Sequence, residues 1–275
     1  MAVTDAVGQV TTLAYEHATD PLKITKVTDP FGRFATLTYT AQGQLESITD
    51  VGGLTSSFRY EKYDFIAMLT TPYGTSVFRH EDNWTWAQYS TRMVEATDPL
   101  GGTEHMEFHW STTAIPATAP ASEVPSGFDS ANRLLNYYNT FYWDKRAWKT
   151  APGDVTQATI TRWTIKGEWA GKVAESIDAP FSIKRPLEGR VWFAYPGQVA
   201  DELGSSMRPS KTARKLDDGT SQISEKTYDT FGNVLTATDP LGRRTSYTYA
   251  ANGADLLEIR RVLSVSLRSV PLAIA

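Results

Sequence analysis

The chain of 275 residues is 41% hydrophobic and 12% aromatic, which is enough apolar material for a sizeable folded core. Its formal net charge of -4 provides no long-range attraction to nucleic acid or to an anionic membrane, so neither is an expected partner. The absence of cysteine excludes disulfides and thiolate zinc sites, and no stretch approaches the roughly 18 apolar residues that cross a bilayer.

A short unit repeats through the first 110 residues and returns near residue 239. In five segments an aspartate is followed three residues later by a glycine and ten residues later by an aromatic side chain. The aspartate and glycine pairs are Asp5 and Gly8, Asp29 and Gly32, Asp50 and Gly53, Asp98 and Gly101, and Asp239 and Gly242. The closing aromatics are Tyr15, Tyr39, Tyr60, Phe108 and Tyr249, and Tyr228 opens the most complete unit at 228–249.

These spacings predict a strand, a tight turn and a second strand in each unit. Aspartate favours the first position of a β-turn, proline the second and glycine the fourth. Beyond the turn an apolar side chain precedes each closing aromatic by two residues, which is the period of a strand with one buried face. Those apolar residues are Leu13, Leu37, Phe58, Met106 and Tyr247.

A sixth copy at 69–74 is degenerate, because Thr71 stands where the aspartate is expected and Arg79 and Glu81 interrupt the apolar alternation. The first half of the unit also departs from strict alternation, since Leu45 and Ile48 are three residues apart. A β-bulge would account for this spacing, and the register of these strands stays open at the level of sequence.

The repeat disappears across residues 111–222, a stretch that begins with a proline-rich loop at 116–127 and is rich in aromatic side chains after it. We expect diverged strands of the same sheet there, with a separate inserted β domain as the alternative. The repeat returns at 223–261, and 262–275 is an atypical tail in which Leu263, Val265 and Leu267 predict an exposed edge strand. The fold class is therefore all-β, with antiparallel hairpin repeats in an extended, curled sheet.

Candidate catalytic and ligand-binding residues are few, and each has a structural explanation. The repeated aspartates suit turns better than calcium or acid/base chemistry. His105 and His109 would lie roughly 13 Å apart on a strand, too far to share one metal ion. We therefore expect no catalytic residues, metal or cofactor, and the aromatic belt at 137–148 is interpreted as core, with sugar stacking as the alternative.

The residues Tyr-Asp-x-x-Gly, Thr-Asp-Pro-x-Gly and Tyr-x-Tyr at 228–249 resemble the YD repeat of the Rhs proteins. The resemblance is specific at 3–60 and 228–259 and partial at 61–110. It implies a spiral of β-hairpins in a large hollow shell, which in bacterial members encloses a C-terminal toxin before delivery. Related shells occur in insecticidal toxin complexes and in teneurin-type adhesion proteins.

This resemblance implies a non-enzymatic structural segment whose partners are the remainder of a longer shell and its toxin cargo. It also implies a secreted or cell-surface location, although 1–5 lead directly into a repeat and show no cleavable signal. The chain shows neither a toxin domain nor the autoproteolytic aspartate motif of the bacterial core, because Asp239-Pro240-Leu241-Gly242 is an ordinary repeat turn. The alternative function is a cell-surface recognition or glycan-binding module that uses exposed aromatics to bind carbohydrate.

Overall fold

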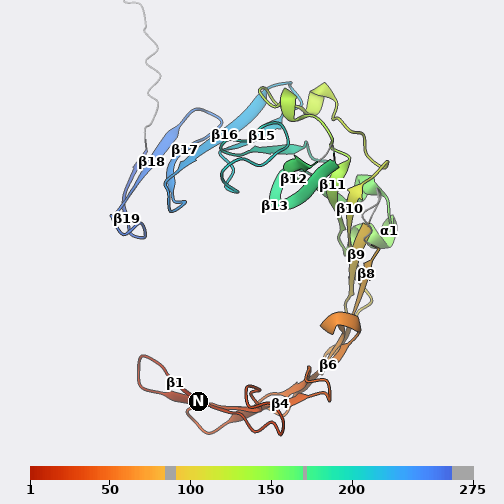
Figure 1. Cartoon of the computed structure of the whole chain (residues 1–275), viewed down its shortest axis with the longest axis vertical. Coiled ribbons are helices and arrows are strands. Elements are labelled where there is room, and N and C mark those ends of the chain that lie inside the picture. Colours follow the sequence, from red (N-terminus) through yellow and green to blue (C-terminus); the bar gives the residue numbers. More distant parts are fainter. Residues whose placement is uncertain (84–90, 170–171, 262–275) are drawn as a thin grey trace, which may run out of the picture. The chain divides into compact units, whose positions relative to one another are not determined.

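The computed structural model describes residues 1–83, 91–169 and 172–261. Strands dominate these residues (Figure 1), so the all-β prediction is confirmed. The α-helical content of the described residues is limited to α1 (Lys145–Thr150), where the Asp144 carboxylate caps the helix by accepting a hydrogen bond from the Ala147 amide. The edge strand predicted within 262–275 lies outside the described residues.

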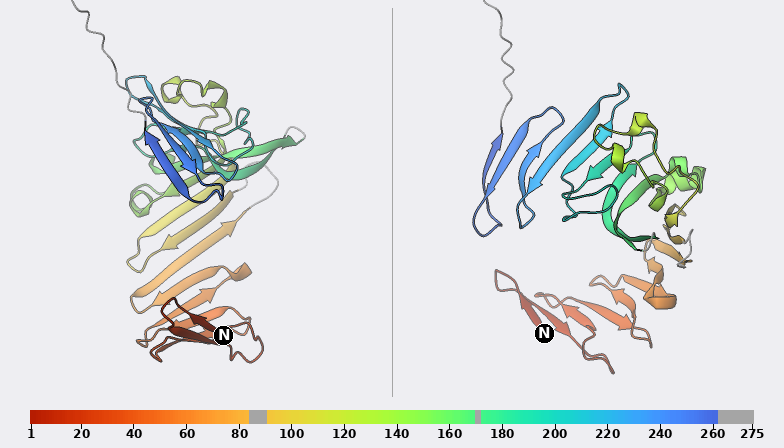
Figure 2. Two further views of the ribbon diagram at one scale, coloured as in Figure 1. Left: turned by 90° about the vertical axis from the view of Figure 1, so that its left-hand side faces the viewer. Right: turned by 45° about the horizontal axis from the view of Figure 1, so that its top comes forward.

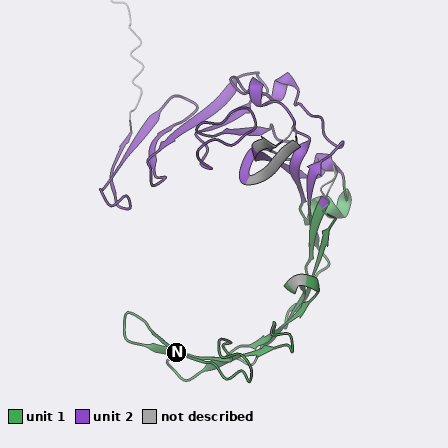
Figure 3. Ribbon diagram, viewed as in Figure 1, with its two compact units in different colours: residues 1–83, 92–107, 143–153 green, residues 84–91, 108–142, 154–275 purple. Residues whose placement is uncertain are grey.

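Contacts between residues divide the chain into two compact units (Figure 3). Unit 1 comprises 1–83, 92–107 and 143–153, and unit 2 comprises 84–91, 108–142 and 154–275. This grouping follows spatial contacts, whereas the sequence-based boundaries at 110 and 222 follow the repeat pattern. The strands β9 (Thr91–Thr97), β10 (Thr103–Ser111) and β11 (Tyr137–Trp143) have residues in both units.

The sheet of unit 1 is a succession of antiparallel hairpins in chain order (Figure 2). The short 3-10 helix η1 (Lys62–Asp64) lies in one connection. Its strands are β1 (Ala2–Thr4), β2 (Val10–Ala14), β3 (Lys26–Thr28), β4 (Phe34–Tyr39), β5 (Leu45–Thr49), β6 (Thr55–Tyr60), β7 (Ile66–Thr71), β8 (Gly74–Asp82) and β9 (Thr91–Thr97).

Unit 1 buries very little of its side-chain surface. Among its described residues Ala67, His105 and Trp143 are the buried ones, and most other strand residues are half-buried or exposed. The strands form a single layer that bends along its length (Figure 3), and a single layer cannot enclose either of its faces. The cross-strand hydrogen bonds and side-chain pairs therefore carry most of its organisation.

Unit 2 continues the antiparallel pattern from β11 to β19. Its further strands are β12 (Thr159–Trp169), β13 (Lys172–Lys184), β14 (Val191–Ala194), β15 (Lys211–Lys215), β16 (Ser221–Tyr228), β17 (Val234–Thr238), β18 (Arg244–Tyr249) and β19 (Leu256–Arg261). Short 3-10 helices occur at η2 (Ala121–Glu123), η3 (Asp129–Ala131) and η4 (Val155–Gln157).

A packed core distinguishes unit 2, and the proline-rich segment at 112–136 supplies five of the eight buried residues in its cluster. Val124, Phe128 and Leu135 of this segment cluster with Phe181 of β13 and Trp192 of β14. The indole of Trp192 is fully buried, and its Nε1 donates a hydrogen bond to the backbone oxygen of Glu123 at 2.8 Å. The segment that the sequence marks as a loop therefore forms a second layer over the sheet.

Candidate functional site

The five repeat turns share one hydrogen-bond arrangement. In the last of them Asp239 Oδ1 accepts from the amides of Leu241 and Arg243 at 2.9 and 3.0 Å, and the Gly242 amide donates to the Asp239 backbone oxygen. The carboxylates of Asp5, Asp29, Asp50 and Asp98 accept from the amides two and four residues onward in the same way. Each carboxylate is thus occupied by donors of its own turn.

The glycine of each turn has a left-handed backbone, with φ between 78° and 84°. These residues are Gly8, Gly32, Gly53, Gly101 and Gly242. A Cβ atom added to any of them would meet no heavy atom within 4 Å, so the requirement for glycine comes from its conformation and not from lack of space.

Neighbouring cations and amides lower the pKa of Asp98 and of Asp239. Burial tends to raise the pKa of Asp239, but the Arg243 guanidinium at 2.6 Å and the turn amides outweigh it and hold that pKa below its ordinary value. The pKa of Asp98 is lowered chiefly by the ammonium of Lys145, whose Nζ lies 2.7 Å from Oδ2. A carboxyl group with a lowered pKa is poorly suited to donate a proton at neutral pH.

Three of the repeat tyrosines use their hydroxyl groups to join neighbouring hairpins. The hydroxyls of Tyr39 and Tyr60 donate to the backbone oxygens of Ile24 and Leu45, each fifteen residues upstream, at 2.7 and 2.9 Å. The hydroxyl of Tyr228 donates to the Pro209 oxygen at 2.9 Å. The predicted repeat aromatics Tyr15, Tyr39, Tyr60, Phe108, Tyr228 and Tyr249 are all half-buried.

A β-bulge lies opposite four of these tyrosines, which explains the irregular spacing in the first half of the unit. Thr38 pairs with Ser47 and Tyr39 with Leu45, so Glu46 is the extra residue. The same shift at Tyr60, Tyr228 and Tyr249 makes Ala67, Leu235 and Leu257 the extra residues. The bulge places residues three apart in sequence on one face of the sheet, as at Leu45 and Ile48.

Among the described residues of unit 1, His105 is the most enclosed ionisable side chain, at 5% exposure. Its Nδ1 lies 3.1 Å from Oε2 of Glu95 and its Nε2 lies 2.9 Å from Oε1 of Glu107. The imidazole stacks on the indole of Trp148 in α1, with ring centroids 3.7 Å apart and an interplanar angle of 2°. One face of the imidazole and both ring nitrogens are therefore engaged within the fold.

The face predicted to be buried is wrong for this copy of the repeat. Met106, the apolar residue of the pattern, is 42% exposed, whereas the adjacent His105 points into the protein. The physical reason is α1, whose Trp148 packs with Trp143 over the His105 side of the strand. His109 makes a separate contact, edge-on to Phe141 at 5.1 Å.

Most of the aromatic belt at 137–148 is core. Tyr138, Phe141 and Trp143 are at most 3% exposed and Trp148 is half-buried, whereas Tyr142 is 36% exposed. The belt therefore presents no aromatic platform comparable to a sugar-stacking surface.

A buried ion pair in unit 2 has no counterpart in the repeat pattern. Nη2 of Arg162 lies 3.1 Å from Oδ2 of Asp201, Nε of Arg162 donates to the backbone oxygen of Leu134, and the arginine side chain is fully enclosed. Burial lowers the pKa of Arg162 to about 10, although Asp201 opposes that change. The pair is hidden from solvent, so it fixes the loop at 195–210 against β12 and offers no accessible reactive group.

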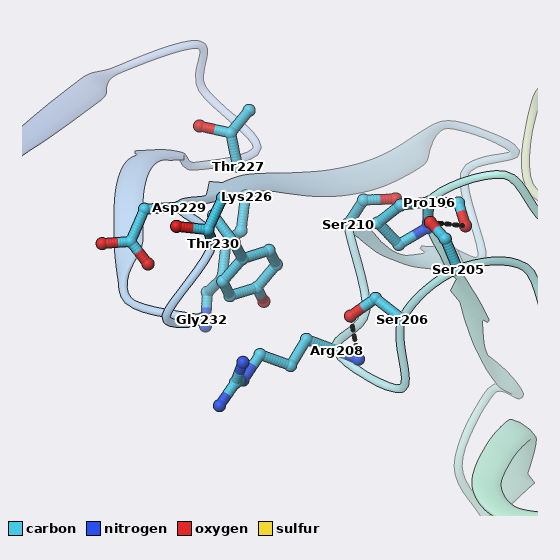
Figure 4. Close-up of a pocket in the computed structure, with 11 residues that line it drawn as sticks. Pro196, Ser205, Ser206, Arg208, Ser210, Lys226, Thr227, Asp229, Thr230 and Gly232 are labelled. Atoms are coloured by element: carbon cyan, nitrogen blue, oxygen red, sulfur yellow. Dashed lines mark hydrogen bonds between the residues drawn. The ribbon is translucent and has the colours of Figure 1, made fainter. Parts of the chain in front are cut away.

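An open pocket of about 610 Å³ in unit 2 lies beside the turn that follows β16 (Figure 4). Ser205, Ser206 and Arg208 line it from the β14–β15 loop, and Lys226, Asp229 and Gly232 line it from β16 and the turn. Asp229 Oδ1 accepts from the Asn233 amide at 2.8 Å and Oδ2 accepts from Asn233 Nδ2 at 3.0 Å. The sequence does not predict this charged pocket, because the segments that form its two sides are some twenty residues apart in the chain.

Across residues 1–83, 91–169 and 172–261, no group of three or more His, Asp or Glu side chains could hold a metal ion. No helix in this part of the chain is long and apolar enough to cross a membrane.

Comparison with known proteins finds the repeat in two places. The family model described as RHS Repeat matches residues 20–55 and 228–253. Among curated proteins none matches the chain. The two matched stretches contain the turns at Asp29, Asp50 and Asp239 and the bulges at Glu46 and Leu235.

Solved structures of much larger proteins are similar to the chain at low identity. A crystal structure of TcdB2-TccC3-Cdc42 has a TM-score of 0.48 at 13% identity, and the match covers 94% of this chain and 13% of that chain. A Photorhabdus luminescens Tc holotoxin pore has a TM-score of 0.27 at 13% identity, over 91% of this chain and 14% of that chain. The chain therefore contains RHS repeats at 20–55 and 228–253.

Proposed function

We propose that the chain is a non-enzymatic structural segment of the wall of an RHS-type shell that encloses a toxin polypeptide. The observation that carries this proposal is the recurrence of one hydrogen-bonded turn at five aspartates, in which every carboxylate accepts from backbone amides of its own turn. Such a unit supports a sheet and leaves no reactive group presented to a substrate.

The distribution of titratable groups supports a structural role over an enzymatic one. The imidazole of His105 is held between Glu95 and Glu107 and stacked on Trp148, and Arg162 and Asp201 are sealed in the interior. A glycosidase needs two carboxylates roughly 5–10 Å apart across a cleft that admits the sugar. The repeat aspartates lie in turns and are engaged there.

The partners and the location follow from the family resemblance. The proposed partners are the remainder of a longer repeat array, which continues the sheet, and a toxin cargo inside it. The proposed location is secreted or at the cell surface. The chain spans 13% and 14% of the lengths of the two larger proteins compared above, so activities of any whole protein remain proposals for this segment.

The carbohydrate-binding alternative loses its main support from the burial of the belt. Trp143 and Phe141 are each 1% exposed and cannot stack on a sugar without local unfolding. We therefore favour the structural role.

The test uses the exposed strand β19. It pairs with β18 along one edge, its six residues are all exposed, and within the described residues its other edge has no strand partner. If this edge normally continues the array, the chain should self-associate in sedimentation velocity as its concentration rises. The substitution Ile259→Lys, at a residue 59% exposed, should weaken that association.

Leu241→Lys is the matched control, because Leu241 is 74% exposed but lies in a turn away from the edge. Association that is reduced equally by both substitutions, or a chain that stays monomeric at every concentration, would contradict the proposal.

A further inference from the structure

Two loops in different repeats have the same construction. In unit 1 the amide and hydroxyl of Thr25 both donate to the Ala14 oxygen, at 2.9 and 3.3 Å. In unit 2 the amide and hydroxyl of Ser210 both donate to the Ala194 oxygen, at 2.8 and 3.2 Å. The residues on either side can therefore be placed in correspondence between the two loops.

The repeat tyrosines extend this correspondence. Tyr39 donates to the oxygen of Ile24, and Tyr228 donates to the oxygen of Pro209, the residues just before Thr25 and Ser210. Counting back one further residue pairs Lys23 with Arg208. Counting back three more pairs Asp20 with Ser205.

Both loops place a cation over the glycine of the following turn. The ammonium of Lys23 lies where a side chain at Gly43 would project, and the guanidinium of Arg208 lies where one at Gly232 would project (Figure 4). The two glycines have φ values of 87° and 86°, so the cation in each case covers the same left-handed turn.

The charge balance of the two loops differs. Nζ of Lys23 lies 3.6 Å from Oδ2 of Asp20, so the cation of unit 1 has a carboxylate beside it. In unit 2 the equivalent residue is Ser205, whose hydroxyl donates to the Pro196 oxygen at 3.3 Å. Within the described residues the guanidinium of Arg208 has neither a hydrogen bond nor an ion pair, although its amide donates to the Ser206 hydroxyl at 3.1 Å.

The remaining charges of the pocket leave it cationic. The Lys226 ammonium also lacks an ion pair among the described residues, and both oxygens of Asp229 are already bonded within its own turn. Two cations and one engaged carboxylate thus line an open hollow of about 610 Å³.

We propose that this pocket binds a carboxylate of another polypeptide, with Arg208 as the residue that recognises it. The planar guanidinium can donate two parallel hydrogen bonds to a carboxylate, and Lys226 adds charge that favours the same ligand. The Asp20 carboxylate beside Lys23 in the matching loop indicates the chemical class of ligand. The assignment goes beyond the shell role and does not depend on it.

The test measures binding of short peptides to the full chain by calorimetry and by the NMR resonance of the Arg208 Nε–H group. One peptide carries an internal aspartate and an amidated C-terminus, and a second carries asparagine and a free C-terminus. Binding of the first identifies a side-chain carboxylate and binding of the second a chain terminus, and either outcome supports the assignment. Binding of neither peptide, or of inorganic phosphate in preference to both, would overturn it.

Two substitutions locate the site. Arg208→Gln removes the guanidinium, and Ser205→Asp supplies an internal carboxylate as in unit 1, so each should weaken peptide binding about tenfold or more. Lys211→Gln is the control, because Lys211 is a cation on β15 that pairs with Glu225 at 2.9 Å and does not line the pocket. If all three variants lost the same amount of peptide affinity, the change in net charge alone would explain the loss. That result would contradict a specific site.

Discussion

At the scale of single residues, the turn aspartates act as hydrogen-bond acceptors for the backbone. Asp239 accepts from two amides and pairs with Arg243, and Asp29 does the same with Arg33. The sequence predicts these turns because aspartate and glycine have defined positions in them. It does not predict the arginine pairing, which depends on how the side chain of the residue after the glycine folds back onto the aspartate.

Acid should weaken these turns. The pKa of Asp239 and of Asp29 is lowered in the folded chain from the reference value of 3.8, so their contribution to stability is present above that value and is lost as pH falls below it through the folded pKa. Asp239→Asn keeps an acceptor oxygen but cannot titrate, so it should remove part of the acid dependence measured by thermal unfolding between pH 2 and 6. At neutral pH, Asp239→Ala should lower the melting temperature by a few degrees more than Asp239→Asn does, because alanine supplies no acceptor oxygen. An unchanged acid profile in Asp239→Asn would contradict the role of this carboxylate.

The hydroxyls of Tyr39, Tyr60 and Tyr228 should each stabilise the junction between two hairpins. Tyr39→Phe removes the hydrogen bond to Ile24 and leaves a half-buried carbonyl without that donor, so it should lower the free energy of unfolding by about 1 kcal/mol. Tyr249→Phe is the matched control, since within the described residues the Tyr249 hydroxyl has no protein partner. Denaturant unfolding that gives equal losses for the two variants would contradict the assignment.

At the scale of elements, the sequence predicts that the strands contain bulges but not where the extra residue lies. The three-residue spacing of Leu45 and Ile48 shows that a regular strand is interrupted, but the position of the extra residue depends on pairing with Tyr39 in the neighbouring strand. The buried face of β10 is a clearer example of what the sequence does not predict. The apolar pattern points to Met106, and only the helix α1, forty residues further on, makes His105 the buried residue instead.

Helix α1 should hold β10 through one aromatic stack. Trp148→Ala removes the ring that lies 3.7 Å from the His105 imidazole, so it should lower the free energy of unfolding by at least about 1 kcal/mol. It should also increase the rate at which diethyl pyrocarbonate modifies His105, measured by mass spectrometry. Lys149→Ala, at the exposed neighbouring position of the same helix, should change stability by less than about 0.5 kcal/mol. A His105 that stays equally protected in Trp148→Ala would show that α1 does not cover it.

At the scale of the whole molecule, the two units show what composition can and cannot predict. Aromatic and β-branched content predicts strands throughout, which is confirmed. It does not predict that 112–136 packs as a second layer on Phe181 and Trp192, because prolines mark irregular backbone whether or not that backbone covers a core. Within its described residues unit 1 has no comparable layer beyond helix α1, and its candidate site residues are spread along the turns of a sheet.

The pocket beside Gly232 also cannot be predicted from the repeat pattern of the sequence. Arg208 and Lys226 are ordinary surface cations by spacing, and only the comparison of two folded loops shows that the carboxylate of Asp20 has no equivalent beside Arg208. The proposed binding site therefore depends on a difference between two repeats, Asp20 in one loop and Ser205 in the other, that lies outside the shared motif.

The most direct test of the structural role is electron cryomicroscopy of the particle that contains this chain, purified from its source through a tag inserted in the exposed turn at Gly101. The proposed function predicts that β1–β19 form part of a continuous wall of hairpins, joined edge to edge to further repeats, with separate polypeptide density on one side. A chain that forms a free-standing domain, with no strands added to its edges and no enclosed polypeptide, would contradict the shell role.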